Sequence, residues 1–310
     1  MIVMHIGLIG LGKMGFNMRQ RLRDADIKVT GYDRNPERTD VESVDALVAT
    51  VPAPRIIWVM VPAGEITDSV ITDLAGKLEA GDLVIDGGNS KFTEDQNHEA
   101  LLAEKNVGFV DVGVSGGVWG LANGYGLMAG GDPDRVQAAM PLFDALRPEG
   151  PREESFVHVG DVGAGHYAKM VHNGVEYGLM QAYAEGYELL EAKDIIKDVH
   201  GTFRAWQKGT VVRSWLLDLM VKALEEDPGL SKIAGYVEDS GEGRWTVEEA
   251  IAHAVPAPAI TAALFARFAS RQDDAPAMKM VSALRNQFGG HAVRAPGARN
   301  AAEQHNDNQK

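Results

Sequence analysis

A glycine-rich turn near the N-terminus restricts the possible folds of this chain more than any other feature. Gly10, Gly12 and Gly15 form the pattern G-x-G-x-x-G, which follows an apolar run over residues 3–9 and opens an amphipathic stretch over residues 13–24. In a strand–turn–helix unit, the first glycine permits the tight turn and the second lets a pyrophosphate approach the backbone. The third lets the helix pack closely on the strand. The context predicts a dinucleotide site, with the phosphates on N–H groups of the helix N-terminus.

An acidic residue follows the next predicted strand, which covers residues 27–32. The carboxylate of Asp33 can accept hydrogen bonds from a ribose diol, and it would repel the 2′-phosphate of NADP at close range. We therefore predict NAD as the cofactor; NADP remains a second option because Arg34 offers a compensating charge. The alternative is that the glycines only form a turn and that Asp33 caps a helix starting near residue 35.

The first half of the chain alternates short apolar runs with helix-length amphipathic stretches. Further strands are predicted at residues 56–60, 83–85, 108–112, 126–129 and 155–159, and helices at residues 13–24, 66–78, 93–105 and 133–146. Near-continuous apolar strands separated by helices are typical of a parallel sheet that is covered on both faces.

The pattern changes to helices alone after about residue 162. Helices are predicted at residues 167–192, 194–208, 211–225, 247–254, 257–270 and 277–288. The predicted fold is an α/β N-terminal Rossmann-type domain over residues 1–162, followed by an all-α domain over residues 163–295 that serves substrate binding and dimerisation. Residues 296–310 are polar, and we predict that they form a mobile tail.

Composition excludes several classes of function. The 310 residues carry 30 Lys and Arg against 44 Asp and Glu, a net charge of -14, which argues against nucleic acid or an anionic membrane as partner. The absence of cysteine rules out disulfides and thiolate chemistry. No apolar run reaches the roughly 18 residues of a membrane span, and glycines interrupt the N-terminal run where a signal peptide would be continuous. We expect a cytoplasmic protein.

One predicted helix carries a row of polar side chains. Lys169, His172, Asn173, Glu176 and Tyr177 recur at the spacing of one helical face. The opposite face is an apolar and glycine-rich stripe that we expect to pack within the protein, formed by Val171, Gly174, Val175, Gly178, Leu179 and Ala182. An embedded helix with such a row predicts a functional cleft, whereas the alternative is a solvated surface of paired polar groups.

The residue types in this row suit two proton transfers. A partly desolvated Lys169 has a lowered pKa, so its neutral amine can take the proton of a secondary alcohol while a hydride leaves for a nicotinamide. Glu176 lies about 10 Å further along the helix axis and can serve a second step at another carbon. His172 and Glu176 have metal-ligand spacing, but no third strong ligand is evident, so no metal is expected.

The chain resembles the decarboxylating 6-phosphogluconate dehydrogenases, in a short-chain form, within the β-hydroxyacid dehydrogenase superfamily. The matching blocks are GLGKMG at 10–15, DGGNS at 86–90, VGVSGG at 112–117, KMVHNGVEYG at 169–178, GRWT at 243–246, FAR at 265–267 and RNQFGGH at 285–291. They follow the family order over nearly the whole chain, and HNGxEYG and DGGNS are specific to it.

The resemblance implies oxidation of 6-phosphogluconate, loss of CO2 and protonation of an enediol to give ribulose 5-phosphate, a reaction of the pentose phosphate pathway and of gluconate utilization. It implies that Lys169 is the base and that Glu176 protonates C1 of the enediol. The residues that would hold the sugar acid are Asn89, Ser115, Gly116, Gly117, His172 and Asn173. The phosphate would be held by Ser115, Tyr177 and Arg267. Arg285 and His291 would reach the phosphate from a partner subunit in a homodimer or homotetramer. The cofactor site would be lined by Met14, Val61 and Asn89 in addition to the glycine turn.

Two positions depart from the long-chain members of this family. Ser240 and Glu242 stand where those members have a Lys and a Thr for the phosphate, so either phosphate binding relies more on Arg267, Arg285 and Arg244, or the phosphate site itself differs. Each motif also has a simpler interpretation. Asn89 and Ser90 can cap a helix, the paired glycines can form a turn only, and Arg267 can pair with a surface acid.

Two other functions remain open. A non-decarboxylating β-hydroxyacid dehydrogenase would keep the glycine turn, the SGG block and Lys169, but it has no use for a second acid at Glu176. A catalytically silent NAD-binding sensor would need neither Lys169 nor Glu176.

Overall fold

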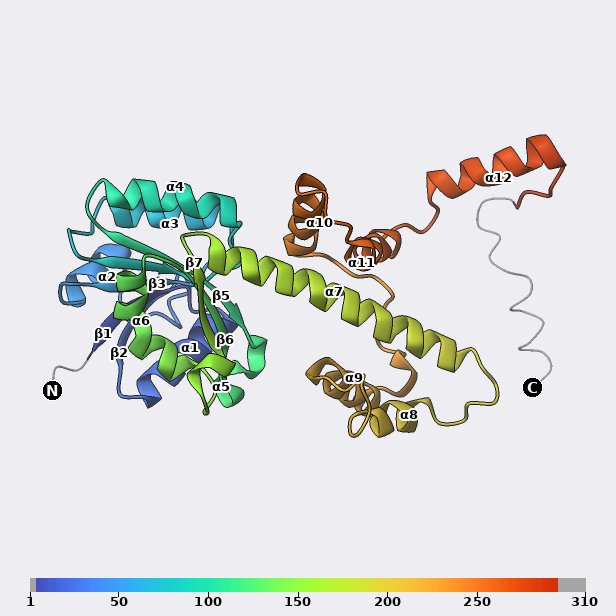
Figure 1. Ribbon diagram of the computed structural model, residues 1–310, viewed down its shortest axis with the longest axis horizontal. Coiled ribbons are helices and arrows are strands. Elements are labelled where there is room, and N and C mark those ends of the chain that lie inside the picture. The colour runs from blue at the N-terminus through green and yellow to red at the C-terminus, as the bar shows by residue number, and fades with distance from the viewer. Residues whose placement is uncertain (1–3, 295–310) are drawn as a thin grey trace.

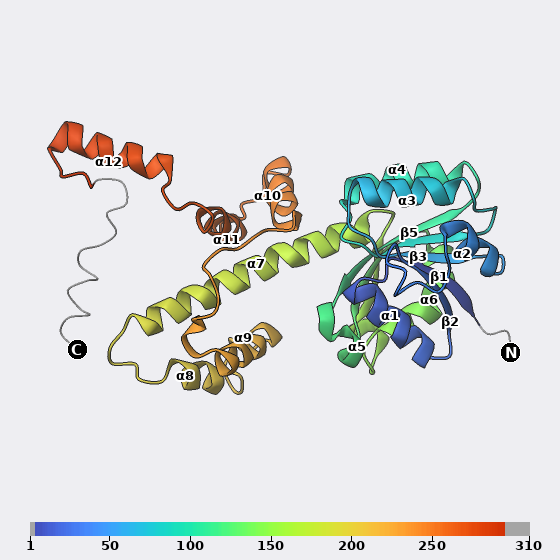
Figure 2. The ribbon, with the colours of Figure 1, turned by 180° about the vertical axis from the view of Figure 1, so that it is seen from behind.

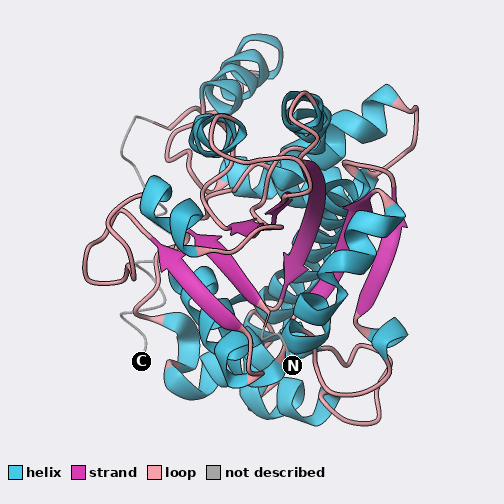
Figure 3. Ribbon diagram, turned by 90° about the vertical axis from the view of Figure 1, so that its left-hand side faces the viewer, coloured by secondary structure: helices cyan, strands magenta, loops and turns pink. Residues whose placement is uncertain are grey.

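The computed structural model describes residues 4–294. Its first half is one seven-stranded sheet in the order β2-β1-β3-β4-β5-β6-β7, with helices on both faces (Figures 1 and 3). The strands are β1 (His5–Ile9), β2 (Lys28–Tyr32), β3 (Ile56–Val59), β4 (Leu83–Asp86), β5 (Gly108–Ser115), β6 (Gly126–Gly131) and β7 (Phe156–Gly160). All seven predicted strands are present, which confirms the Rossmann-type α/β fold.

Each face of the sheet has its own apolar core. On one face, Leu8 and Trp58 pack against helices α1 and α6, where Phe143 is fully buried. On the other face, Ile57 packs against α2, α3 and α4, where Leu74 is fully buried. The helices are α1 (Lys13–Asp24), α2 (Val44–Thr50), α3 (Glu65–Ala75), α4 (Phe92–Ala103), α5 (Gly120–Asn123) and α6 (Pro133–Leu146). Because alternate side chains enter opposite cores, the central strands β1, β3 and β4 are largely apolar on both faces.

The sheet is not parallel throughout, and in this respect the prediction is wrong. Strand β6 runs antiparallel to β5, with Val112 opposite Ala129, while all other neighbouring strands are parallel. Residues 116–125 connect the two strands through a 3₁₀ turn (Gly117–Trp119) and the short helix α5. A parallel crossover needs about a dozen residues or more, so this connection returns the chain in the opposite direction.

The second half is helical and is organised along α7 (Ala164–Glu191), which projects away from the sheet (Figures 1 and 2). The other helices are α8 (Val199–Trp206), α9 (Trp215–Glu226), α10 (Glu242–Ala252), α11 (Pro258–Ala269) and α12 (Pro276–Gly289). One small core surrounds the buried Phe203, and another joins Tyr177 to Leu264. The last strand ends at Gly160, and α7 begins at Ala164.

The apolar stripe on α7 does not pack within the chain as predicted. Val171, Val175 and Leu179 are exposed, and only Gly174 of that stripe is buried. Part of the polar row is buried instead: Lys169 lies over Gly113 of β5, and Tyr177 lies against Gly243 of α10. The predicted tail, residues 296–310, lies outside the described residues. Among residues 4–294, no helix is long and apolar enough to cross a membrane.

Candidate active site

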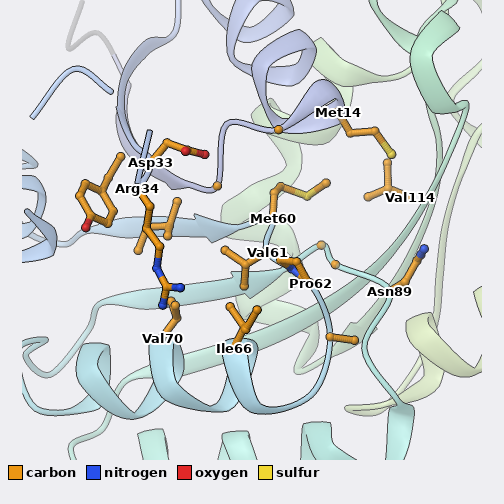
Figure 4. A pocket seen from close by; sticks show the side chains of 17 residues that line it. Met14, Asp33, Arg34, Met60, Val61, Pro62, Ile66, Val70, Asn89 and Val114 are labelled. Carbon is orange, nitrogen blue, oxygen red and sulfur yellow. The ribbon is translucent and has the colours of Figure 1, made fainter. Parts of the chain in front are cut away.

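A cavity of about 530 Å³ lies at the carboxyl ends of the central parallel strands (Figure 4). Of the predicted cofactor residues, Gly10, Gly12, Met14, Asp33, Arg34, Val61 and Asn89 line it. Asp33 and Arg34 lie at one end, while Asn89, Met14 and Val114 lie at the other (Figure 4). This elongated arrangement, at the edge where α/β sheets bind ligands, suits a dinucleotide.

The three glycines of the turn have different structural roles. Gly10 has a φ of +93°, and a Cβ there would lie 2.4 Å from the Met60 carbonyl oxygen. Gly15 does not line the cavity; a Cβ there would lie 2.0 Å from the Gly10 carbonyl oxygen, so the helix could not pack so closely on the turn. A Cβ on Gly12 would meet no protein atom. The open space at Gly12 lets a ligand approach the backbone, as the sequence pattern predicts.

The carboxylate of Asp33 is oriented by the backbone around it. One oxygen accepts a hydrogen bond from the Leu11 N–H at 2.6 Å, and the other accepts one from the Asn35 N–H at 2.8 Å. Asp33 thus forms a turn with Asn35, and no helix begins there, contrary to the capping alternative. Its carboxylate is fixed at the cavity wall, where a ribose diol can reach its remaining lone pairs.

Lys169 is buried at the base of α7, directly over β5. Its side chain is 7% exposed, and its Nζ donates to Asn173 Oδ1 at 2.6 Å. A Cβ on Gly113 of β5 would lie 2.4 Å from the Lys169 Cβ, so the helix rests on this glycine. Burial lowers the pKa of Lys169, and the nearby carboxylates of Glu176 and Glu242 oppose part of that shift. The site therefore favours a neutral amine more than water does.

His172 and Glu176 lie on the more open side of the same row. His172 Nε2 is 3.3 Å from Ser115 Oγ at the end of β5, and its Nδ1 is 3.0 Å from Asn173 Oδ1. The Glu176 side chain is 39% exposed, and its nearer oxygen is 3.9 Å from His172 Nδ1. A carboxylate and a buried amine thus face the same region from one helix. Ser115 and His172 also line a second cavity of about 530 Å³, while Val114, one residue earlier, lines the first.

Tyr177 and Arg267 are brought together as the family resemblance implies. The Arg267 guanidinium lies 3.4 Å from the centre of the Tyr177 ring, and Tyr177 itself is buried. The Ser240 N–H donates to the Tyr177 hydroxyl oxygen at 3.2 Å, and Ser240 Oγ donates to a Glu242 carboxylate oxygen. Arg267 does not pair with a surface acid; its Nη1 donates to a backbone carbonyl.

Arg244 is paired elsewhere and does not add a second cation beside Arg267. Its Nε and Nη2 donate to the two carboxylate oxygens of Asp239 at 2.7 and 3.0 Å, and Arg271 donates to the same carboxylate at 3.0 Å. Arg285 lies on α12, away from α7 and the sheet, and His291 follows that helix (Figure 1). The structure therefore does not bring Arg285 or His291 to Lys169 of the same chain.

The GGNS and SGG segments are shaped for ligand approach. Ser90 Oγ donates to Asp86 at 2.6 Å and does not cap α4, whose N-cap residue is Lys91 without a side-chain cap. Asn89 is left facing the first cavity. Gly116 has a φ of +143° and Gly117 one of +54°, so this turn requires glycine.

The sequence interpretation missed a set of buried polar residues under the site. Asp111 of β5 accepts hydrogen bonds from the N–H groups of Gly163 and His166 and so caps the start of α7. The sequence did contain a signal for this role, because Asp111 is the one acid in an otherwise apolar strand. A buried carboxylate needs hydrogen-bond donors around it. Gly113 was also missed, because one glycine in a strand does not indicate what lies above it.

Comparison with known proteins assigns these features to a family. Models of the NAD binding domain and of the C-terminal domain of 6-phosphogluconate dehydrogenase match residues 5–149 and 165–304. The NAD(+)-dependent, decarboxylating 6-phosphogluconate dehydrogenase of Haloferax volcanii is 40% identical over 301 residues, which cover 94% of this chain and 98% of that protein. This chain belongs to the 6-phosphogluconate dehydrogenase family.

Other members of the family are longer or use the other nucleotide. The NADP(+)-dependent, decarboxylating 6-phosphogluconate dehydrogenase of Bacillus subtilis is 35% identical over 288 residues, 86% of this chain but 61% of that relative. The solved structure of the Plasmodium falciparum 6-phosphogluconate dehydrogenase, described with NADP+ and with 6-phosphogluconate, is 27% identical with a TM-score of 0.79 and covers 98% of this chain and 68% of that chain. The family thus confirms an NAD(P)-dependent oxidoreductase and leaves the nucleotide preference open.

Proposed function

We propose that this 6-phosphogluconate dehydrogenase family member oxidises and decarboxylates 6-phosphogluconate to ribulose 5-phosphate and CO2, with NAD as its preferred cofactor. The observation that carries the proposal is the polar row of α7: the buried Lys169 and Glu176 both lie beside His172, whose imidazole is close to Ser115, one residue beyond Val114 in the wall of the dinucleotide cavity. Simple oxidation of an alcohol requires one proton acceptor. Decarboxylation also requires a proton donor, because loss of CO2 leaves an enediol carbon that must be protonated.

The residues of the cavity fit a nicotinamide dinucleotide. Gly12 leaves the backbone open to a pyrophosphate, and Asp33 presents a fixed carboxylate at the far end of the cavity. When bound, the cofactor supplies an acceptor for the hydride. The chain contributes the pyrophosphate cradle through Gly10 and Gly12 and the ribose contact through Asp33, while Asn89, Met14 and Val61 line the wall.

Lys169 is the proposed base of the oxidation. Its neutral amine takes the proton of the C3 hydroxyl as the C–H bond breaks, so the carbonyl forms without a high-energy alkoxide. Asn173 holds the amine through the 2.6 Å hydrogen bond. The resulting ammonium then stabilises the charge that develops on the carbonyl oxygen as the C1–C2 bond breaks and CO2 leaves.

Glu176 is the proposed acid of the last step. Loss of CO2 leaves an enediol whose terminal carbon, C1 of the product, needs a proton, and protonated Glu176 delivers it. His172 lies between Glu176 and Ser115. We propose that it binds substrate hydroxyls together with Asn89, Asn173, Gly116 and Gly117.

The phosphate is proposed to bind at Tyr177 and Arg267 with help from Ser115. Long-chain members have a Lys for the phosphate in this part of the chain. Here Ser240 and Glu242 carry no positive charge and hydrogen-bond each other, so neither replaces that Lys. We propose that Arg285 and His291 of a second copy complete the site, in a homodimer or homotetramer. The exposed Val171, Val175 and Leu179 on α7 support a partner surface in the helical unit, residues 163–295. The expected cytoplasmic location stays a prediction.

The decisive assay incubates the purified chain with 6-phosphogluconate and NAD or NADP, and measures reduced cofactor and CO2 together. We expect equal amounts of both products, with kcat/KM higher for NAD, and much lower rates with unphosphorylated gluconate as a control. Reduced cofactor without CO2 would instead support a β-hydroxyacid dehydrogenase. Nucleotide binding without turnover of any hydroxy acid would support the sensor.

A further inference from the structure

A buried ion pair joins two segments of the proposed site: residues 87–95, which contain Asn89 and the first turn of α4, and residues 164–169, the start of α7 up to Lys169. Asp95, in the first turn of α4, is 0% exposed, and His166, in the first turn of α7, is 2% exposed. His166 Nδ1 lies 2.8 and 3.0 Å from the two carboxylate oxygens of Asp95. None of the steps proposed above uses either group.

The pair connects functional residues through short and rigid links. Lys169 lies one helical turn beyond His166 on α7. Asn89 lies in the loop that leads into α4, three residues before that helix begins at Phe92. Asp95 lies in the first turn of the same helix. The rings of Phe92 and Tyr167 meet edge to face beside the pair, with 5.0 Å between their centres. A shift between α4 and α7 would therefore change the separation of Asn89 and Lys169.

Each segment is also attached separately to the sheet. Asp86, at the end of β4, accepts hydrogen bonds from the Gly88 N–H at 2.9 Å and from Ser90 Oγ. Asp111, on β5, accepts hydrogen bonds from two N–H groups at the start of α7. These contacts hold each segment to its own strand, and only the Asp95–His166 pair joins the segments by an ion pair among the described residues.

The chemistry of the pair is better suited to fixing the position of α4 relative to α7 than to stabilising the folded protein. Burial by itself would lower the pKa of His166, but the facing Asp95 carboxylate outweighs this effect and raises the pKa, which favours the charged imidazole. Two buried charges recover little net stability, because desolvation opposes their attraction, whereas their geometry is strict. Atoms of Asp95, Asp111 and His166 lie within 4.8 Å, as metal ligands can, but both Asp111 oxygens already accept N–H groups.

We propose that Asp95 and His166 are positioning residues that set the separation of Asn89 and Lys169, and thereby hold the reacting carbon of the substrate between the base and the cofactor. The inference rests on the proposed function, since it assigns the pair a role in that site. It predicts that loss of the pair lowers kcat strongly, while cofactor affinity changes little, because most residues that line the cofactor cavity lie outside both segments.

The first test compares Asp95→Asn with a matched control, Asp82→Asn. Asp82 is also 0% exposed and accepts a hydrogen bond from the Arg55 N–H at 2.6 Å, but it precedes β4 at the end of the sheet opposite the cavity. For Asp95→Asn we expect kcat to fall by about 10- to 100-fold, as for a misplacement near 1 Å, with KM for the cofactor within about threefold of wild type. For Asp82→Asn we expect a lower Tm with kcat unchanged.

A second pair of variants decides the question if Asp95→Asn does not fold. His166→Asn keeps an N–H donor near the position of Nδ1, whereas His166→Ala removes it, so His166→Asn should retain at least about tenfold more kcat. All rates are measured well below the Tm of each variant. Equal kcat in the two His166 variants, wild-type kcat in Asp95→Asn, or the same kcat loss in Asp82→Asn would overturn the proposal.

Amide hydrogen exchange separates failure of this inference from failure of the proposed function. Wild-type protein that forms no CO2 from 6-phosphogluconate would refute the proposed function alone. Faster exchange confined to residues 87–91 and 164–169 in Asp95→Asn would still support the positioning role. Unchanged exchange in both segments would contradict it whatever the activity.

Discussion

The substitution Gly113→Ala tests whether α7 must rest directly on the sheet for the chemistry to work. Gly113 lies in β5, and its backbone conformation is one that alanine adopts, so only space opposes the change. The new Cβ would lie 2.4 Å from the Lys169 Cβ and 2.8 Å from the Gly165 carbonyl oxygen, where 3.4 Å is an ordinary contact. Helix α7 would therefore have to retreat by about 1 Å.

The expected effect on catalysis is comparable in free energy to the effect on stability, but it is specific to the base. Overpacking of this kind costs about 1–3 kcal/mol of the free energy of unfolding. A misplacement near 1 Å of a reacting group costs about 100-fold in rate, which corresponds to about 2.7 kcal/mol in activation free energy. Since Lys169 is the displaced residue, we expect kcat to fall about 100-fold, with the Kd for NAD within about threefold of wild type.

Steady-state kinetics, NAD titration and denaturant unfolding measure the three quantities. Gly186→Ala, on the same helix, is the matched control, because a Cβ there meets no atom within 4 Å. It should stabilise the protein by about 0.5–1 kcal/mol and leave kcat unchanged. Wild-type kcat in Gly113→Ala would refute the argument that close packing places the base. A parallel loss of NAD binding would show instead that the whole site had collapsed.

Four further predictions concern single groups of the site. Lys169→Ala should lower kcat by about 100- to 10,000-fold while NAD still binds in a fluorescence titration, and near-normal turnover would exclude it as the base. Glu176→Gln should slow CO2-linked product formation more than hydride transfer in a single-turnover experiment; equal losses would deny it a separate late step. Asp33→Asn should narrow the ratio of kcat/KM for NAD over NADP, and a wild-type preference for NADP would contradict the charge argument. Because burial lowers the pKa of Lys169 and the base must be neutral, kcat/KM should fall as the pH drops through that lowered pKa and level off above it; no such loss down to pH 5 would contradict this.

The sequence predicted the α/β half well because its signals are local. Helices α1 and α6 have the predicted bounds, since a glycine turn begins the first and Pro133 begins the second, after Asp132, which accepts hydrogen bonds from the N–H groups of the first turn. The direction of β6 was missed because strand periodicity is the same in parallel and antiparallel pairs. Helix α2 was missed because seven residues give too short a periodic pattern.

The candidate site was predicted in part. Helical spacing placed Lys169, Asn173 and Tyr177 on one face, and the structure buries all three. The same spacing could not show which face of α7 would be covered, and the apolar Val171 and Val175 are the exposed ones. Periodicity reports that two faces differ, whereas burial depends on what packs against each face.

The sequence by itself determined the cradle for a dinucleotide and the family of the chain, because a glycine turn and the residues on one helical face depend on neighbours a few positions apart. Only the tertiary structure decided that Gly113 supports Lys169, that Arg267 stacks on Tyr177, and that Asp95 meets His166. These contacts join residues from 56 to 90 positions apart, and nothing in a linear sequence specifies such a distance. Close packing and buried charge make them strict, since a shift of about 1 Å breaks a hydrogen bond or creates an overlap.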